Sequence, residues 1–504
     1  MPLLSPSATQ QKREVLLTEE KHLADALSDI RTALNDLTAV ASLPTEILEE
    51  VFGICVSWLY GHQKPKYRLA WTQVCRTWRR ISFNSARLWH CIDLCDSRLA
   101  HEFLIRSKTA PISIVSASPL KLCTENLQPH ANRLQAIDVF LFPDDMVSLF
   151  DSIGPNLSSL THMSLRIPPV SSNLILEIDV SNVTRLMLDC VAIPWDTCGG
   201  LTYMSLRGLP TEYAPSLPQL FTIFKSSPDL EYVKLECIAP ALADDHPPTD
   251  SISLPKLREL VISGKPPLIH TLLSGLILPI SARLQFNCPT FDDLNAFLPA
   301  DQHWRRPEIS TLRLSRRAAN FIQVGAASWS DEHLDSLISL SSSSPTNNII
   351  LSGLTSILDL SHITTIELSS GALFELQPNF VWEFLTQTMN LNCLRIAPHY
   401  NLDELFHVLT PLLPPSDSGH VCPHLTTISF GKPGEMWGDF GDLWLKPLFA
   451  LAKARHTNSV PFSLVEFKQC KLNQNTVELF DGIVAGVSIC EQLNIPPSRR
   501  SIFG

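Results

Sequence analysis

The residues of this chain that could do chemistry are glycines beside a lysine, single histidines and scattered cysteines. The segment GKPGEMWGDFG at 431–441 lacks the G-x-x-x-x-G-K-[ST] order that arranges backbone N–H groups around a phosphate. No G-x-S-x-G and no H-E-x-x-H motif occurs. His162, His270 and His424 each stand singly near apolar residues, where a core or edge histidine is commoner than a metal ligand. We therefore expect neither an enzyme, nor a metal site, nor a cofactor.

The thirteen cysteines are an odd number and include no C-x-x-C pair. The closest two, Cys91 and Cys95, lack a second ligand pair at zinc-like spacing. This distribution favours reduced, mostly structural thiols over a disulfide or metal framework. Cys190, Cys237 and Cys288 each follow the last apolar residue of a strand-like segment by two positions, so we expect them to point into the core.

The composition is that of a folded protein, with 504 residues of which 45% are hydrophobic and 18% charged. The formal charge of -11 argues against a surface built as a whole for nucleic acid. The N-terminus lacks the apolar stretch of a signal peptide, and the longest apolar run, at 268–280, is too short to span a bilayer. We expect a cytoplasmic or nuclear protein without a membrane contact.

The elements that must position any functional residue begin with a heptad pattern. Leu16, Leu23, Ile30 and Leu37 recur every seven residues, and Leu27 and Leu34 each fall four residues after a member of that series. The pattern predicts a coiled-coil-like helix over 12–41. Its apolar seam could pack against the same chain or against a second copy, and we prefer the first.

Residues 42–92 form a second block with more apolar residues than a small module can bury. In SLPTEILEEVF at 42–52, Pro44 suits a first helical turn, Ile47 and Val51 mark one line, and Leu48 and Phe52 mark a neighbouring line. Two or three short helices cannot shelter both lines together with Val74, Trp78 and Trp89. Part of this set should therefore contact something outside the module.

Most of the remaining chain repeats a pattern of the form L-x-x-L-x-L, mostly at steps of 18 to 29 residues. Each copy predicts a short strand that buries one face only by stacking against its neighbours in a parallel sheet. The copies are LQAIDV (134–139), LTHMSL (160–165), VTRLML (183–188), LTYMSL (201–206), LEYVKL (230–235), LRELVI (257–262), ISTLRL (309–314), ITTIEL (363–368), LNCLRI (391–396) and LTTISF (425–430). The spacing is that of leucine-rich repeats. The Asn or Cys that such repeats usually carry three positions after the last leucine is absent, since these places hold Val191, Leu209, Ile238, Lys265 and Arg317.

The stretch LPTEILEEVF, followed by VCRTWRRI and then LW, resembles the F-box, in the F-box-like form of fungal proteins that carry irregular leucine-rich repeats. The resemblance implies that the module docks on the SKP adaptor of a cullin and RING (SCF-type) ubiquitin ligase and that the repeats bind a target protein. It assigns adaptor contacts to Leu43, Pro44, Ile47, Leu48, Val51, Phe52, Val74, Cys75 and Trp78. The segment from Gly61 to Tyr67 is longer than the turn of the compact F-box.

The expected fold is thus α/β, with a small all-helical F-box-like module followed by an irregular leucine-rich-repeat solenoid with a parallel sheet. We expect the N-terminal helix at 12–41, the F-box-like domain at 42–92 and the repeat array at 93–495. If the strands line a concave face, their outward residues would meet the target protein. The outward residues that we assign to target binding are Asp138, Lys234, Arg313, Glu367 and Arg395, accompanied by Ser164, Met187, Ser205 and Ser429.

Two other functions remain open. The helices could merely cap the first repeat of an interaction scaffold that has no link to ubiquitin. Residues 53–92 contain no acidic residue but several basic ones, which suits a solvated helix face, an acidic partner protein or, least of all, nucleic acid. The basic residues are Lys64, Lys66, Arg68, Arg76, Arg79, Arg80 and Arg87.

Overall fold

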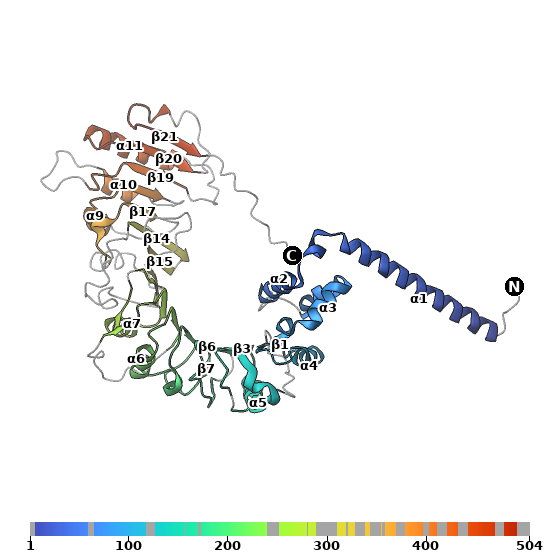
Figure 1. Cartoon of the computed structure of the whole chain (residues 1–504). Helices are drawn as coiled ribbons and strands as arrows, with labels where there is room; N and C mark the ends of the chain where they lie inside the picture. The colour runs from blue at the N-terminus through green and yellow to red at the C-terminus, as the bar shows by residue number, and fades with distance from the viewer. Residues whose placement is uncertain are drawn as a thin grey trace. The chain divides into compact units, whose positions relative to one another are not determined.

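The computed structural model forms two compact units, Met1–Ile193 and Pro194–Gly504. Figure 1 shows the helices and strands of both. The structure describes residues 6–58, 65–116, 127–155, 157–169, 173–238, 251–279, 281–288, 310–318, 321–327, 338–342, 354, 358–368, 378–396, 403–410, 421–431, 442–468 and 478–490. The glycine-rich segment after Gly431 and the acidic residues Asp244, Asp245 and Asp250 lie outside these ranges.

The first unit opens with helices. The heptad segment forms one long helix, α1 (Pro6–Asp36), as its periodicity predicts, but this helix begins before residue 12 and ends before residue 41, the predicted bounds. Three further helices follow at α2 (Thr45–Trp58), α3 (Arg76–Asn84) and α4 (Ser97–Arg106), and α5 (Pro143–Ile153) lies between two strands. Short 3-10 helices occupy η1 (Ala39–Ser42), η2 (Pro65–Gln73), η3 (Ala86–Trp89) and η4 (Gln128–Arg133).

A parallel sheet completes the first unit. Its strands pair in the order β1 (Cys91–Asp93), β2 (Ile112–Ser116), β3 (Leu134–Phe140), β4 (His162–Arg166) and β6 (Arg185–Asp189). The short strands β5 (Leu174–Ile175) and β7 (Val191–Ala192) form a separate pair. Alternate residues of the strands, such as Met163 and Leu165, are buried, which is the one-sided burial that the repeated motif predicts.

The second unit continues the same pattern of parallel strands. One run contains β8 (Tyr203–Arg207), β9 (Tyr232–Glu236), β11 (Glu259–Ser263) and β13 (Arg283–Cys288). A second run contains β14 (Thr311–Ala318), β17 (Thr365–Leu368), β18 (Cys393–Ile396), β19 (Thr427–Phe430), β20 (Leu464–Lys468) and β21 (Val487–Cys490). The small strands β10 (Ile252–Ser253) and β12 (Leu276–Ile277) pair separately.

Besides β13, β20 and β21, two further strands that join these runs lie outside the ten copies of the motif. β15 (Phe321–Ala327) is antiparallel to both β14 and β16 (Ile338–Ser342), and β16 in turn pairs in parallel with β13. The long steps on either side of the motif at 309 therefore hold β13 in one case and this antiparallel insertion in the other. All ten copies of the motif contain a strand.

Helices connect the strands of the second unit. They are α6 (Leu217–Ser226), α7 (Pro266–Ser274), α9 (Pro378–Gln387), α10 (Asp403–Leu409) and α11 (Asp442–Thr457), with 3-10 turns at η5 (Trp195–Thr197) and η7 (Leu360–His362). Figure 1 shows α9, α10 and α11 on one side of β17, β18, β19 and β20. Helix α6 begins at Leu217 because Ser216 and Gln219 form a reciprocal capping box there.

The expected burial of the three strand-end cysteines is wrong for one of them. Cys190 and Cys288 are 7% and 2% exposed, whereas Cys237 is exposed. Cys288 still belongs to β13, so the strand alternation carries it inward with Phe286. Cys190 and Cys237 both follow the end of a strand and have a left-handed backbone, with φ of 61° and 52°, so the alternation of the strand fixes the burial of neither.

We expect the buried thiols to resist alkylation. Burial raises the pKa of Cys198 to about 12 and that of Cys422 to about 11, so almost no thiolate is present at mild pH. At pH 8 iodoacetamide should modify the exposed Cys55 and Cys237 within minutes and leave Cys198 and Cys422 intact until denaturant is added. Peptide mass spectrometry measures this, and rapid native labelling of Cys422 would contradict it.

No helix among the described residues has the length and apolarity that crossing a bilayer requires.

Candidate docking surface

Helix α2 separates its two apolar lines into one buried and one exposed. Leu48 and Phe52 are 3% and 2% exposed, whereas Ile47 and Val51 are 49% and 42% exposed. Residues four apart share one face of a helix, so each pair behaves as a unit. The helix therefore places one stripe in the core of its own module and leaves the adjacent stripe in solvent.

Leu48 and Phe52 are corrections to the predicted adaptor contacts. The Phe52 ring packs against the ring of Trp78, with centroids 4.8 Å apart, and Trp78 is itself half-buried. A partner could reach Leu48 or Phe52 only by opening the module. Trp78 of α3 covers the line formed by Leu48 and Phe52. The module therefore buries more of its apolar surface than its size suggested.

The exposed stripe is longer than the sequence indicated. Leu43 precedes the helix and is 40% exposed, and Ile54 continues the line of Ile47 and Val51 at 48%. The sequence analysis did not single out Ile54, although its place seven residues after Ile47 was a sufficient signal. We call Leu43, Ile47, Val51 and Ile54 the α2 stripe. Val74, another predicted contact, is exposed at 55% just before α3.

Pro44 and Cys75 have structural roles at the starts of the two helices. The carbonyl oxygen of Pro44 accepts hydrogen bonds from the N–H groups of Ile47 and Leu48, at 3.1 and 3.2 Å. The Cys75 sulfur accepts from the Trp78 N–H at 3.4 Å and so caps α3. This cap fixes the start of α3 at Arg76.

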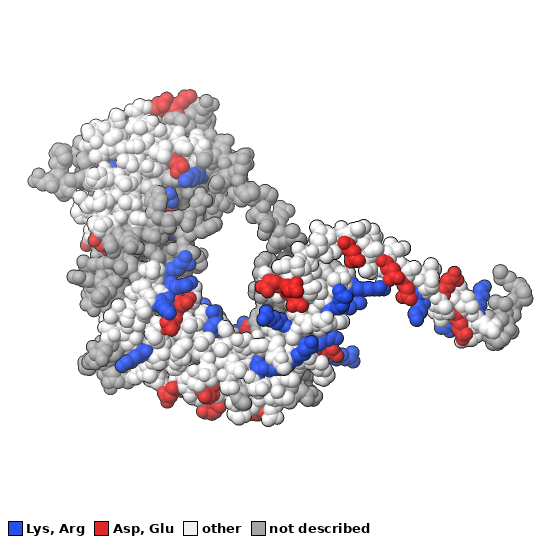
Figure 2. All heavy atoms as spheres, in the orientation of Figure 1, with Lys and Arg blue, Asp and Glu red and all other residues white. Residues whose placement is uncertain are grey.

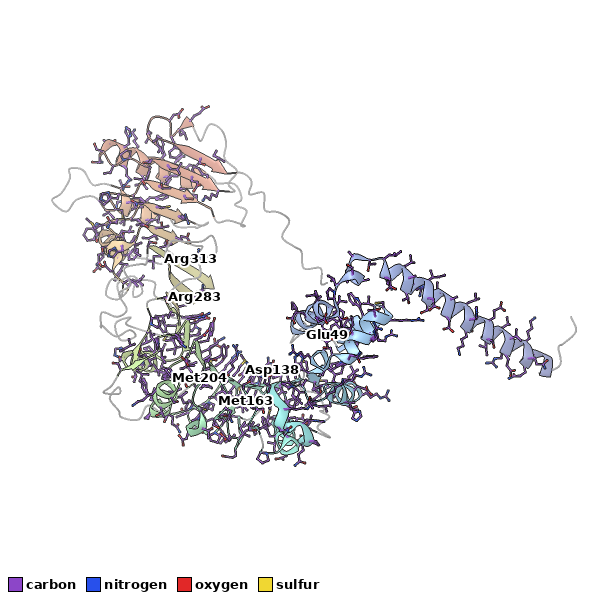
Figure 3. The ribbon with its side chains drawn as sticks, viewed as in Figure 1. Glu49, Asp138, Met163, Met204, Arg283 and Arg313 are labelled. Carbon is purple, nitrogen blue, oxygen red and sulfur yellow. The ribbon has the colours of Figure 1, made fainter. Side chains whose placement is uncertain are left out.

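Charged residues of opposite sign accompany the two helices. Glu46, Glu49 and Glu50 lie on α2 beside the apolar stripe, and Figure 2 shows acidic side chains gathered there; Figure 3 labels Glu49. On α3, Arg76 is already paired, because its guanidinium donates to Asp29 and Ser28 of α1 at 3.0 and 2.7 Å. At least one residue of the basic cluster, Arg76, is thus already bound to other side chains of the same chain.

Trp89 ties the module to the sheet. Its ring is 1% exposed, packs edge-on against Phe103 of α4 at 4.9 Å between centroids, and lies under the Arg106 guanidinium at 4.6 Å. Its indole N–H donates to the carbonyl oxygen of Ser82 on α3 at 2.7 Å. One side chain therefore links the last helix of the module to the first helix of the strand region.

A second candidate surface is the outward face of each sheet. In the first unit, strand register places Asp138, Ser164 and Met187 side by side in one row. Figure 3 labels Asp138, whose carboxylate accepts a hydrogen bond from Arg166 at 3.0 Å. Sequence analysis named Asp138 without this arginine, which occupies the next outward place on β4.

In the second unit, the predicted residues fall in corresponding positions of each run. Ser205 lies opposite Lys234 in one run, while Arg313, Glu367, Arg395 and Ser429 are consecutive partners in the other. The register thus brings together the residues that the motif predicted to face outward in each run, but Ser205 and Ser429 are buried, at 7% and 1% exposed, so they are not surface residues as predicted. Their role in binding a target protein stays a prediction.

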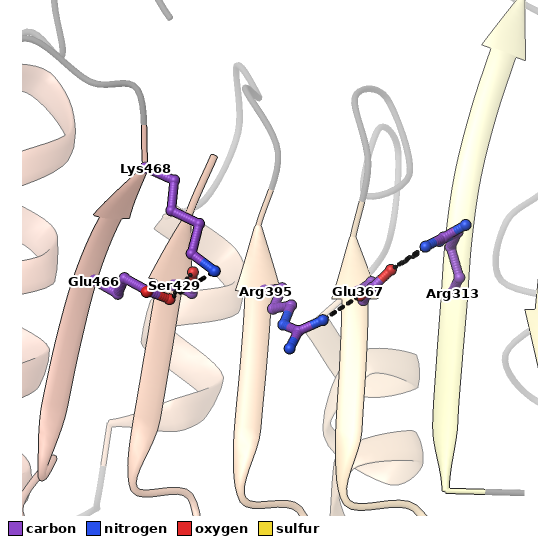
Figure 4. A network of polar contacts seen from close by, with 6 residues as sticks. All are labelled: Arg313, Glu367, Arg395, Ser429, Glu466 and Lys468. Atoms are coloured by element: carbon purple, nitrogen blue, oxygen red, sulfur yellow. Dashed lines mark hydrogen bonds and ion pairs between the residues drawn. The ribbon is translucent and has the colours of Figure 1, made fainter. Parts of the chain in front are cut away.

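Glu367 holds two arginines together, as Figure 4 shows. Its carboxylate accepts from Arg313 at 2.8 Å and from Arg395 at 2.7 Å. Burial by itself would raise the pKa of Glu367, but the two guanidinium groups lower it below the usual value of 4.5. A second group follows on the next strands, where Ser429 and Lys468 both contact the carboxylate of Glu466.

We expect Glu367→Gln to destabilise the second unit by roughly 2 kcal/mol at pH 7, because two charge-assisted hydrogen bonds weaken. The pKa of Glu367 is lowered in the folded state, so the stabilisation is present above the usual pKa and is lost as the pH falls through the lowered value. Urea titrations at pH 7 and pH 3 measure it: the difference from the native chain should shrink at pH 3. Glu383→Gln, at an exposed site on α9, is the control. An undiminished difference at pH 3 would contradict the assignment.

A shallow polar hollow lies where three strands of the second unit begin, and sequence analysis singled out only one of its residues. It is lined by His362, Thr364, Asn390, Asn392 and His424. Within the described part of the chain, no three His, Cys, Asp or Glu side chains gather closely enough to hold a metal ion.

Comparison with known proteins gives one match. The model of the F-box-like family matches residues 40–95, which include the α2 stripe, α3 and Trp89. A search of curated proteins found none that matches the chain. F-box domains generally bind SKP-type adaptors, and the exposed stripe of α2 fits such a module. The chain therefore carries an F-box-like domain at residues 40–95, followed by a region of parallel strands and connecting helices.

Proposed function

We propose that this chain is the substrate-recognition subunit of an SCF-type E3 ubiquitin ligase. The F-box-like domain would dock on an SKP-family adaptor, and through it on a cullin and RING ligase, while the strand region would bind a target protein. The observation that carries the proposal is the α2 stripe: four aliphatic side chains, each 40 to 49% exposed, of which three lie on a helix whose other apolar line is buried and one, Leu43, just precedes that helix.

The energetics support a stable contact. Burying each of these side chains completely would contribute roughly 1.5 to 3 kcal/mol, less for the part that is already covered. Val74 can add to the same contact from the start of α3. The total can offset an association cost of roughly 4 to 15 kcal/mol only if most of the stripe is covered at once. We therefore expect the stripe to act as one unit.

The strand region suits target binding by its form. We propose that it is an irregular leucine-rich-repeat solenoid of the fungal F-box-like type, since one strand per motif and helical connections recur along it. Its outward rows carry Asp138 in the first unit and Lys234, Arg313, Glu367 and Arg395 in the second, and we propose these residues as target contacts. Ubiquitin transfer itself would be performed by other subunits in the cytoplasm or nucleus.

Trp89 supports one competing function. Because it packs the module firmly against α4, the helices could serve only as the cap of an interaction scaffold. A pull-down of the full chain with a purified SKP-family adaptor separates the two functions. Binding in the micromolar range or tighter supports the receptor, and absence of binding by a correctly folded chain favours the cap.

A further inference from the structure

Helix α1 exposes an apolar seam from Leu16 to Leu34, and Leu37 extends it just beyond the helix. In heptad notation, Leu27 and Leu34 occupy core position a, and the residues at core position d are mostly aliphatic. The d residues are Thr9, Leu16, Leu23, Ile30 and Leu37. The apolar members of the two series are between 48% and 84% exposed. A helix this long with an uncovered apolar stripe normally has a partner.

The rest of the same chain contacts the opposite side of α1. Asp29 and Ser28 receive the guanidinium of Arg76, and Ser28, Thr32 and Asn35 are the described α1 residues that are half-buried. These residues occupy heptad positions b, c and f, which lie across the helix from the seam. The preferred interpretation of the heptad, packing against its own chain, is therefore wrong for the described residues.

We propose that the α1 seam binds the α1 seam of a second copy of this chain in an antiparallel coiled coil. Charge at the core positions decides the orientation. A parallel dimer in register would place Arg13 against Arg13 and Glu20 against Glu20 at position a, two repulsive layers in four heptads. Such a pair would also bring Lys12 and Glu19 beside charges of their own sign.

An antiparallel pair centred on residue 25 removes both repulsive layers. It places Leu27 opposite Leu23 and Leu34 opposite Leu16 of the second copy, each contact occurring twice by symmetry. Glu20 then lies level with Ile30 of the second copy, and Arg31 is the next residue along that helix, so opposite charges meet beside the seam. This complementarity of the chain with itself is the reason for choosing a second copy as the partner.

Side-chain size agrees with that arrangement. Ala24, Ala26 and Ala33 flank the centre of the seam and let two helices approach closely. Towards the N-terminus the seam is hollowed between Thr9, Lys12, Arg13, Leu16, Leu17 and Glu20. In the antiparallel register this hollow faces Leu34 and Leu37 of the second copy, which would fill it as knobs fill holes.

The molar mass of the full chain in solution tests the association. Light scattering or sedimentation at micromolar concentrations should give twice the mass of one 56.1 kDa chain. Leu23→Glu together with Leu27→Glu should return it to one chain that still folds, because both residues are exposed in the single chain. Val15→Glu is the matched control: Val15 is 64% exposed at position c, and the dimer should persist. A native chain of single mass at every concentration would overturn the proposal.

Cross-linking tests the orientation. Ala26→Cys should form a dimer with a short bis-maleimide at a yield several-fold above that of the native chain, because residue 26 lies near the two-fold axis of the antiparallel pair. Leu16→Cys should not, since its neighbour would be Leu34 of the second copy. The reverse result would show a parallel dimer and overturn the orientation. Neither variant touches α2, so adaptor binding is an independent measurement.

Discussion

Replacing Ile47 and Val51 together by aspartate is expected to weaken adaptor binding by roughly 100-fold or more. Both side chains belong to the α2 stripe and are 49% and 42% exposed. Their loss removes apolar contact, and each carboxylate would have to be desolvated in the interface, so the two effects add. A factor of 100 corresponds to about 2.7 kcal/mol, well within the contribution of two large side chains.

The measurement is a titration of the full chain with a purified SKP-family adaptor by calorimetry. Because the replaced residues are exposed, the thermal transition should move little. Ile105→Asp is the matched control, since Ile105 is 58% exposed on α4 outside the stripe and should leave affinity unchanged. Leu48 and Phe52 are unsuitable sites, because a carboxylate there would unfold the module. Native affinity in the double variant would rule out the α2 stripe as the docking surface.

Trp89→Ala should destabilise the first unit by roughly 3 to 5 kcal/mol. The substitution leaves a large cavity beside α3 and α4, removes the edge-on contact with Phe103 and takes away one of the two aromatic rings under the Arg106 guanidinium, the other being Phe83. It also leaves the Ser82 carbonyl without the indole donor. Urea unfolding followed by far-ultraviolet circular dichroism measures the loss without relying on the removed fluorophore.

Two further substitutions calibrate that result. Trp89→Phe keeps most of the ring but loses the N–H group, so it should cost roughly 1 to 3 kcal/mol. Trp382→Ala removes a tryptophan that is 48% exposed on α9 and should cost well under half as much as Trp89→Ala. If Trp89→Ala lowered the free energy of unfolding by as little as Trp382→Ala, the contact between the module and the strand region would not be stabilising.

The sequence predicted the strands well because their signal is strong and local. Each motif alternates apolar and polar residues over a few positions, and the pairing partner of each strand is another copy of the same motif. The outward residues could therefore be named in advance, down to the row that joins Arg313, Glu367 and Arg395. The antiparallel β15 lacks the motif, and so its place in the sheet could not be predicted.

The docking residues were harder to predict because burial depends on tertiary packing. Periodicity showed that α2 has two apolar lines, but it could not say which one Trp78 would cover. Local chemistry was also overlooked at Cys75, whose thiol was predicted to contact the adaptor but caps α3. At Cys237, which follows the end of β9, the alternation of the strand no longer fixes burial, and the residue is exposed.

The ion pair between Arg76 and Asp29 makes the attachment of α1 sensitive to salt. The two side chains are 56% and 73% exposed, and exposed pairs of this kind contribute no more than about 1 kcal/mol and weaken as ionic strength rises. Helix α1 is about 46 Å long. When salt weakens the Arg76–Asp29 ion pair, we expect α1 to move over a wider range of orientations relative to α3. The hydrodynamic radius should then increase while the helical content stays constant.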